Sequence, residues 1–160
     1  MDVEGHGRMS VIADPTSAVF SLWQSTSDGG GPFVMFENHS IGWVELATRE
    51  TAKAREFYSS LLGWTYTESV IPAIDSGDYI EISVGDTRYG GILPMNSEWG
   101  STPPHWGIYV LVPDVDACVT KAKELGGCNP LPAFDAPGVG RIAKVADPTN
   151  AMCYVIALKN

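Results

Sequence analysis

Residues 140–156 read GRIAKVADPTNAMCYVI and residues 7–23 read GRMSVIADPTSAVFSLW, so one pattern occurs twice, 133 residues apart. The two segments are identical at seven of 17 positions without a gap, more than composition alone would give. Each has an apolar run, then Asp-Pro-Thr followed by Ser or Asn, then a second apolar run. Asp at the first position and Pro at the second are typical of a type I turn, so both segments are predicted to be β-hairpins.

The repeat predicts how the chain is organised. Residues 1–26 are expected to form an N-terminal β-hairpin, the remnant of a preceding repeated unit. Residues 27–41 are expected to be a linker, because they contain the run DGGGP at 28–32. Residues 42–158 are then one complete domain.

Within this domain the apolar periodicity changes twice from strand to helix and back. Strands are predicted at 43–48, 64–67, 78–84 and 87–93, with a helix at 50–62 that has Ala54, Phe57, Tyr58 and Leu61 on one face. A polar connector at 97–104 follows, and the pattern restarts with strands at 105–112, 130–134, 141–145 and 152–158. A helix is predicted at 115–125, capped by Asp114, with Val115, Val119, Ala122 and Leu125 on its inward face. The predicted fold class is α+β, built from two βαβββ modules.

The order WVELAT, EFYSSLLGW, Gly90-Gly91, DVDACVTKAKELGG and RIAKVADPTNA resembles the vicinal oxygen chelate superfamily, which contains glyoxalases, bleomycin resistance proteins and dioxygenases. The layout is most similar to tandem two-domain glyoxalase-like (27-kDa antigen-like) proteins. The resemblance implies paired modules that form a cupped mixed β-sheet with the helices outside. In metal-dependent members a cation lies in the cup.

The positions that the resemblance assigns to metal ligands carry Trp43, Gly107 and Tyr154. None of these supplies the carboxylate, imidazole or amide oxygen that a divalent metal prefers, so neither a metal nor another cofactor is expected. Glu45 and His105 each lie two residues from such a position, hence on the same strand face, and leave a displaced two-ligand metal site as an alternative.

Strand alternation predicts what lines the cup. Trp43, Glu45, His105, Tyr109, Met152 and Tyr154 are the candidate substrate-binding residues, and Glu81 joins them if its strand has the same polarity. A carboxylate among aromatic rings could hold a cation or act as a base. The alternative is that the rings fill the cup as core and that Glu45 bonds a tyrosine hydroxyl.

Composition excludes several classes of protein. With 44% hydrophobic and 18% charged residues the chain is neither disordered nor a coiled coil, and it has no apolar run of 18 residues. Ten basic against 19 acidic residues give a net charge of −9, which argues against nucleic acid or an anionic membrane as partner. Three cysteines cannot all pair and form no C-x-x-C motif, which favours reduced thiols in a cytoplasmic protein.

These observations favour a metal-free domain of the bleomycin-resistance type that binds a small hydrophobic ligand, for which a cationic group is one option. Two alternatives stay open. The first is a metal-independent isomerase or lyase that uses Glu45 or a tyrosine as its acid–base group. The second is a glyoxalase- or dioxygenase-type enzyme with the displaced metal site. An isolated hairpin is marginal in water, so residues 7–23 are expected to add to the edge of their own sheet or to exchange with a second copy in a homodimer.

Overall fold

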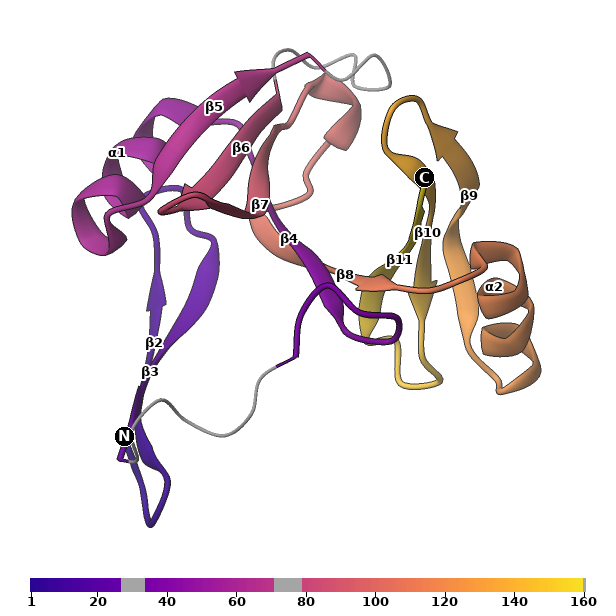
Figure 1. Cartoon of the computed structure of the whole chain (residues 1–160), viewed down its shortest axis with the longest axis horizontal. Coiled ribbons are helices and arrows are strands. Elements are labelled where there is room, and N and C mark those ends of the chain that lie inside the picture. Colours follow the sequence, from indigo (N-terminus) through magenta and orange to yellow (C-terminus); the bar gives the residue numbers. More distant parts are fainter. Residues whose placement is uncertain (27–33, 71–78, 160) are drawn as a thin grey trace.

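The computed structural model describes residues 1–26, 34–70 and 79–159, and these form one large and one small β-sheet with two α-helices (Figure 1). The glycine run at 28–32 and the predicted strand start at residue 78 lie outside the described residues. The elements are β1 (Asp2–Val3), β2 (Gly7–Ala13), β3 (Val19–Ser25), β4 (Ile41–Thr48), α1 (Thr51–Leu62), β5 (Thr65–Ser69), β6 (Tyr79–Val84), β7 (Thr87–Pro94), a 3-10 turn (Ser97–Trp99), β8 (His105–Leu111), α2 (Val115–Glu124), β9 (Cys128–Ala136), β10 (Gly140–Ala146) and β11 (Met152–Leu158).

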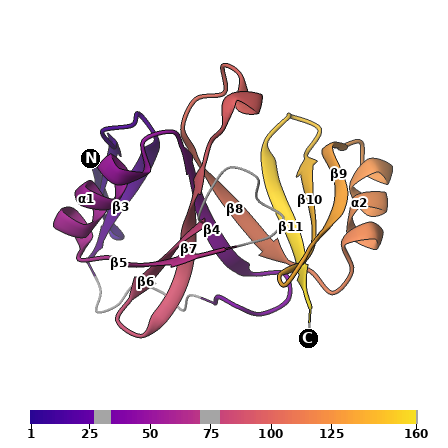
Figure 2. The ribbon, with the colours of Figure 1, turned by 90° about the horizontal axis from the view of Figure 1, so that it is seen from above.

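The large sheet has the order β5-β6-β7-β4-β8-β11-β10-β9. Each half is one βαβββ module, and the halves join through the antiparallel pair β4–β8. Within each module the first strand pairs in parallel with the last, β4 with β7 and β8 with β11. The sheet bends so that α1 and α2 lie on its outer side at opposite ends (Figures 1 and 2). This arrangement confirms the predicted α+β fold with a cupped mixed sheet.

Particular residues mark where α1 ends and where α2 begins. Gly63 follows α1 with φ of 71°, a left-handed conformation that glycine adopts without strain, and its N–H bonds the Ser59 carbonyl. Asp114 caps α2 by accepting a hydrogen bond from the Ala117 N–H. The inner faces bury Ala54 and Tyr58 of α1 and Val115 and Val119 of α2.

Two predicted inward residues are exposed instead. Leu61, in the last turn of α1, is 43% exposed, and Leu125, which follows the last residue of α2, is 67% exposed. Helical spacing identifies the angular face of a residue, but it does not show whether the sheet extends beneath the final turn.

The strand boundaries also differ from the prediction in places. β4 begins at Ile41, two residues early, and β9 extends over Cys128–Ala136 although it contains Pro130 and Pro132. These prolines are tolerated because β9 is an edge strand, where an N–H is not needed on the open side.

The N-terminal hairpin does not add to the edge of the large sheet, so that expectation is wrong. β2 and β3 pair antiparallel over seven residues and form a separate three-stranded sheet with β1. The hairpin instead packs on α1: the Phe20 ring contacts Phe57 and Tyr58 edge-on, at centroid distances of 6.3 and 5.2 Å. Ala18 is fully buried in the same cluster. An apolar cluster and not strand pairing therefore attaches the hairpin to the domain.

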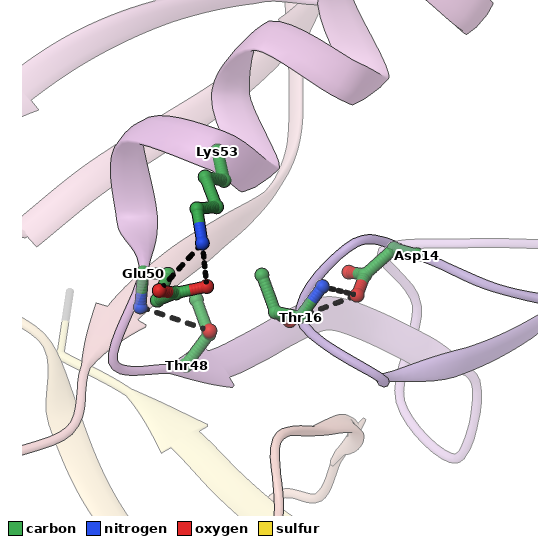
Figure 3. A network of polar contacts seen from close by, with 5 residues as sticks. All are labelled: Asp14, Thr16, Thr48, Glu50 and Lys53. Carbon is green, nitrogen blue, oxygen red and sulfur yellow. Dashed lines mark hydrogen bonds and ion pairs between the residues drawn. The ribbon is translucent and has the colours of Figure 1, made fainter.

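A buried carboxylate completes this attachment. Asp14, which is 5% exposed, accepts hydrogen bonds from the Thr16 N–H, the Thr16 hydroxyl and the Ala18 N–H, and its second oxygen accepts one from the Tyr58 hydroxyl at 3.0 Å. Figure 3 shows this turn beside the end of β4 and the start of α1. Trp106 of β8 in turn donates to the Tyr58 hydroxyl at 3.0 Å. The turn is thus bonded, through Tyr58, to the centre of the large sheet.

The two copies of the repeated segment fold alike. In the β10–β11 turn Asp147 accepts from the Thr149 N–H, the Thr149 hydroxyl and the Ala151 N–H, the same three donors that Asp14 has at its own turn. The arginine that occurs in both copies forms an ion pair in the second: Arg141 makes two hydrogen bonds to Asp116 of α2, at 2.7 and 2.9 Å, which lowers the pKa of that carboxyl. Arg141 therefore ties its hairpin to a helix.

Candidate functional site

The inner face of the large sheet encloses a cavity of about 790 Å³ that both modules line. Its walls come from β4, β6, β7, β8, β9, β10 and β11, and the 3-10 turn contributes Trp99. Seven of the described lining residues are aromatic, beside a larger number of aliphatic residues and glycines: Phe36, Trp43, Tyr79, Trp99, Tyr109, Phe134 and Tyr154. A cavity of this size suits a small organic ligand, since ligand sites commonly measure about 300–1,000 Å³.

Glu45 lines this cavity and is 9% exposed. The Tyr109 hydroxyl donates to Oε1 at 2.7 Å, and the Tyr79 hydroxyl donates to Oε2 at 2.9 Å. The Trp43 indole N–H donates to the Tyr79 hydroxyl at 2.7 Å. Because an indole nitrogen can only donate, the single proton of Tyr79 is left for Glu45. Both carboxylate oxygens therefore accept a hydrogen bond, an arrangement that the ionised group satisfies best.

The glycines on the neighbouring strands make room for this network. Glu45 pairs with Gly91 of β7 on one side and with Gly107 of β8 on the other. A Cβ at Gly91 would lie 2.0 Å from the Tyr79 hydroxyl, and one at Gly107 would lie 3.1 Å from the Tyr154 ring. Tyrosine side chains thus occupy the space that side chains at these two positions would need.

Burial controls the ionisation of these groups. It raises the pKa of the Glu45 carboxyl above its ordinary value, while the hydrogen bonds from Tyr109 and Tyr79 act in the opposite direction. Burial and the neighbouring Glu45 charge both raise the pKa of Tyr79 and Tyr109, so the two phenols remain protonated donors at neutral pH. The site therefore presents a desolvated carboxylate held by neutral donors, which can attract a cation or accept a proton.

The other charges of the lining are mostly of the same sign. Glu81 and Glu98 also line the cavity, against Lys159 as the basic lining residue among the described residues. Glu81 forms an ion pair with Arg88 at 3.2 Å. Tyr109 and Tyr154 stack at 4.5 Å and 9° beside Glu45, and the Lys144 ammonium lies over the Tyr154 ring, 5.0 Å from its centroid.

Of the six candidate residues, the structure brings Trp43, Glu45, Tyr109 and Tyr154 together and leaves two outside the lining. Met152 begins β11 and is 50% exposed. The ring nitrogen Nδ1 of His105 lies 2.9 Å from the Pro103 carbonyl oxygen, and its imidazole packs beside Trp99. Both residues have the predicted strand parity, but they lie at strand ends where the sheet no longer borders the cavity.

The residues at the positions that the resemblance assigns to metal ligands do not suit a divalent metal. Trp43 and Tyr154 line the cup without a ligand group that a divalent cation prefers, and Gly107 has no side chain. In the displaced alternative, both Glu45 oxygens already accept tyrosine protons. Within the described ranges no group of three or more His, Cys, Asp or Glu is placed to bind a metal ion.

Sequence reasoning missed Tyr79, the second donor to Glu45. The signal was present: Tyr79 and Glu81 share strand parity, so fixing the polarity of β6 would have placed both in the cup. Trp99 and Phe134 were also missed, because their approach to the cavity depends on the course of a loop and of an edge strand.

The fold and the cup together define a paired-module βαβββ domain with a small-molecule cavity between its modules. The model of the Glyoxalase/Bleomycin resistance protein/Dioxygenase superfamily matches residues 40–152, and the chain belongs to this superfamily.

Curated relatives are similar over nearly the whole chain. CFP32 of Mycobacterium tuberculosis, which carries the name of a glyoxylase, is 36% identical over 155 residues, 97% of this chain and 58% of that protein. The anthracycline biosynthesis protein DnrV of Streptomyces peucetius is 35% identical over 159 residues, 99% of this chain and 56% of that protein. The chain thus spans little more than half the length of these relatives.

Solved structures share the fold. Methylmalonyl-CoA epimerase from Mycobacterium tuberculosis superposes with a TM-score of 0.56 at 17% identity, covering 75% of this chain and 88% of that one. A variant of the Streptomyces coelicolor methylmalonyl-CoA epimerase gives a TM-score of 0.57 at 15% identity, covering 78% of this chain and 100% of that one. At such identities the likeness concerns the fold.

Neither helix of the described residues has the length and apolarity that crossing a membrane requires.

Proposed function

We propose that this domain binds a small aromatic or aliphatic molecule that carries a positive charge, and that it does so without a metal ion. The observation that carries the proposal is the buried Glu45 carboxylate, which accepts hydrogen bonds from two tyrosine hydroxyls at 2.7 and 2.9 Å and lines a cavity with seven aromatic residues among the described ones.

A cation suits this site better than an anion for two reasons. A buried carboxylate loses its hydration, and an opposite charge restores a favourable interaction without competing for the tyrosine protons. The lining also includes the rings of Trp43, Trp99 and Phe134, and π faces attract cations most strongly when water is excluded. The further carboxylates Glu81 and Glu98 in the lining add to the negative potential.

One relative is named for anthracycline biosynthesis and another as a glyoxylase, and neither name identifies a ligand for this chain. We infer a binding role in the reducing environment of the cytoplasm, supported by three cysteines that form no disulfide.

Thermal-shift measurements test the proposal, because a ligand that binds the native state alone raises the midpoint of unfolding. Benzyltrimethylammonium is expected to raise the midpoint, whereas benzoate, Mg²⁺ and Zn²⁺ are expected to leave it unchanged. Trp43→Ala should reduce the shift, and Met152→Ala, outside the cavity, should preserve it. A shift with benzoate or with a metal ion alone would contradict the proposal.

A further inference from the structure

The connection between β7 and β8 supplies part of the cavity wall. It projects from the ends of these strands (Figure 2) and contributes Asn96, Glu98 and Trp99 to the lining. The backbone hydrogen bonds within residues 96–102 each join residues three positions apart, so they form turns inside the segment. Such turns give the segment a local shape, but they do not attach it to the sheet.

Arg49 supplies this attachment. It directly follows β4, and its guanidinium donates from Nη2 to the Gly100 carbonyl at 2.7 Å and from Nη1 to the Thr102 carbonyl at 3.0 Å. Among the described residues, these are the hydrogen bonds that join residues 96–102 to the rest of the chain. The two carbonyls lie one and three positions after Trp99, so the guanidinium holds the backbone next to a ring that lines the cavity.

The chemistry of a guanidinium suits this task. It has five N–H donors in a fixed plane, so one side chain can bind two carbonyl oxygens at once. Its charge makes these hydrogen bonds stronger than those between neutral groups. Nη1 also lies 3.8 Å from the sulfur of the buried Met95, and within the described chain Arg49 forms no ion pair with a carboxylate. The contacts of this guanidinium are therefore directed at the segment that carries Trp99.

His105, the first residue of β8, contacts the same ring. The centroids of the His105 and Trp99 rings are 6.0 Å apart, and Nδ1 of His105 lies 2.9 Å from the Pro103 carbonyl oxygen. Neither His105 nor Arg49 lines the cavity, whereas Trp99 does. Trp99 is thus the one of these three residues that a ligand in the cavity can touch.

We propose that Arg49 is a positioning residue of the cavity: it fixes residues 96–102 so that the Trp99 ring forms a wall against which the ligand packs. The inference rests on the proposed function, since it requires that the cavity takes a small ligand. Among aromatic side chains an indole attracts a cation most strongly, and it also packs against apolar groups. Arg49 therefore controls the affinity through Trp99 and does not touch the ligand.

Hydrogen exchange on the protein without ligand tests the attachment. Arg49→Ala should make the amides of residues 96–102 exchange about tenfold faster, because hydrogen bonds from a charged group are lost. Arg49→Lys keeps the charge but lacks the planar pair of donors, so its exchange rate should lie between those of the wild type and Arg49→Ala. Arg55→Ala is the matched control: this arginine bonds Glu68 away from the cavity, and its loss should leave the segment unchanged.

Titration calorimetry tests the consequence for binding, with benzyltrimethylammonium and the neutral neopentylbenzene as probes. Trp99→Ala should weaken the binding of both probes by roughly threefold to tenfold. Arg49→Ala should also weaken both, and the double variant should bind no more weakly than Trp99→Ala alone, because Arg49 acts through Trp99. Loss of a positive charge by itself favours a cationic probe, so weaker binding of the cation separates positioning from electrostatics.

Three results would overturn the inference: unchanged exchange in Arg49→Ala, tighter binding of the cation by Arg49→Ala, or effects of the two substitutions that multiply in the double variant. Equal binding of the two probes by the wild type would contradict the proposed function and leave this inference standing, since the comparison of variants can be read on either probe. Binding of neither probe would contradict both.

Discussion

Glu45 is paired with a glycine on each adjacent strand, Gly91 on β7 and Gly107 on β8. Because these glycines have no side chains, tyrosine rings fill the space beside Glu45. A carboxylate at the centre of a β-sheet face is ordinarily costly to bury. Here two phenols satisfy its oxygens, and the stacked Tyr154 covers the ring of Tyr109. The two glycines are therefore part of the site, although neither can touch a ligand with a side chain.

Gly91→Ala is expected to displace the Tyr79 ring, because the new Cβ would lie 2.0 Å from its hydroxyl. The displacement breaks the bonds from Trp43 and to Glu45 and overpacks a buried position, so the free energy of unfolding should fall by about 1–3 kcal/mol. Urea unfolding measures this fall. Gly107→Ala is the matched control, since its nearest contact of 3.1 Å is with a tyrosine ring that can shift by a few tenths of an ångström. Equal effects of the two substitutions would show that the space above Gly91 is not critical.

The residue scale also shows how far the sequence could lead. The alternation of side chains along β4, β8 and β11 predicted that Trp43, Glu45, Tyr109 and Tyr154 face the cup, and in the structure all four line the cavity. His105 and Met152 obey the same parity yet lie outside the cavity, because parity gives a face and does not give the extent of the hollow along a strand. Trp99 reaches the cavity from a 3-10 turn, for which no periodic pattern exists.

At the scale of elements, the hairpin β2–β3 and its counterpart β10–β11 share a turn but differ in what they pack on. β10–β11 packs on the helix of its own module through Ala143, Val155 and Val119. β2–β3 packs on α1 through Phe20 and Asp14. The duplicated sequence predicted two hairpins, but the docking partner depends on the ten of 17 positions at which the copies differ. One of these is Phe20, the counterpart of Cys153, which adds an aromatic ring at the contact with α1.

Asp14→Ala and Asp147→Ala form a matched pair that isolates this docking. Each substitution removes the same three turn bonds, but Asp14→Ala also leaves the buried Tyr58 hydroxyl without its acceptor. An unsatisfied buried polar group costs about 1–3 kcal/mol, so Asp14→Ala should lower the free energy of unfolding by about that much more. Chemical denaturation of the two variants gives the difference. If the two substitutions cost the same, the Tyr58 bond contributes nothing to the attachment of the hairpin.

At the scale of the whole molecule, the two modules contribute to one cavity from opposite halves of the sheet. Glu45 and Tyr79 come from the first module, while Tyr109 and Tyr154 come from the second. The cavity is thus formed only when β4 and β8 pair, and any change at that junction affects both stability and binding. The net charge of −9 gives the molecule a negative field, which favours the approach of a cation to the cup.

The central claim is that the buried Glu45 carboxylate makes this cup selective for a positive charge. Isothermal titration calorimetry with benzyltrimethylammonium and its neutral isostere neopentylbenzene tests it most directly. The wild type at pH 7 should prefer the cation by about tenfold or more, equivalent to about 1.4 kcal/mol. The preference should weaken as the pH falls, because the raised pKa of Glu45 means that this carboxylate is protonated, and loses its charge, at a higher pH than an ordinary glutamate. Glu45→Gln should abolish the preference, and Glu81→Gln, whose native side chain is paired with Arg88, should retain it. Equal affinity for the two probes in the wild type, or an undiminished preference in Glu45→Gln, would contradict the claim.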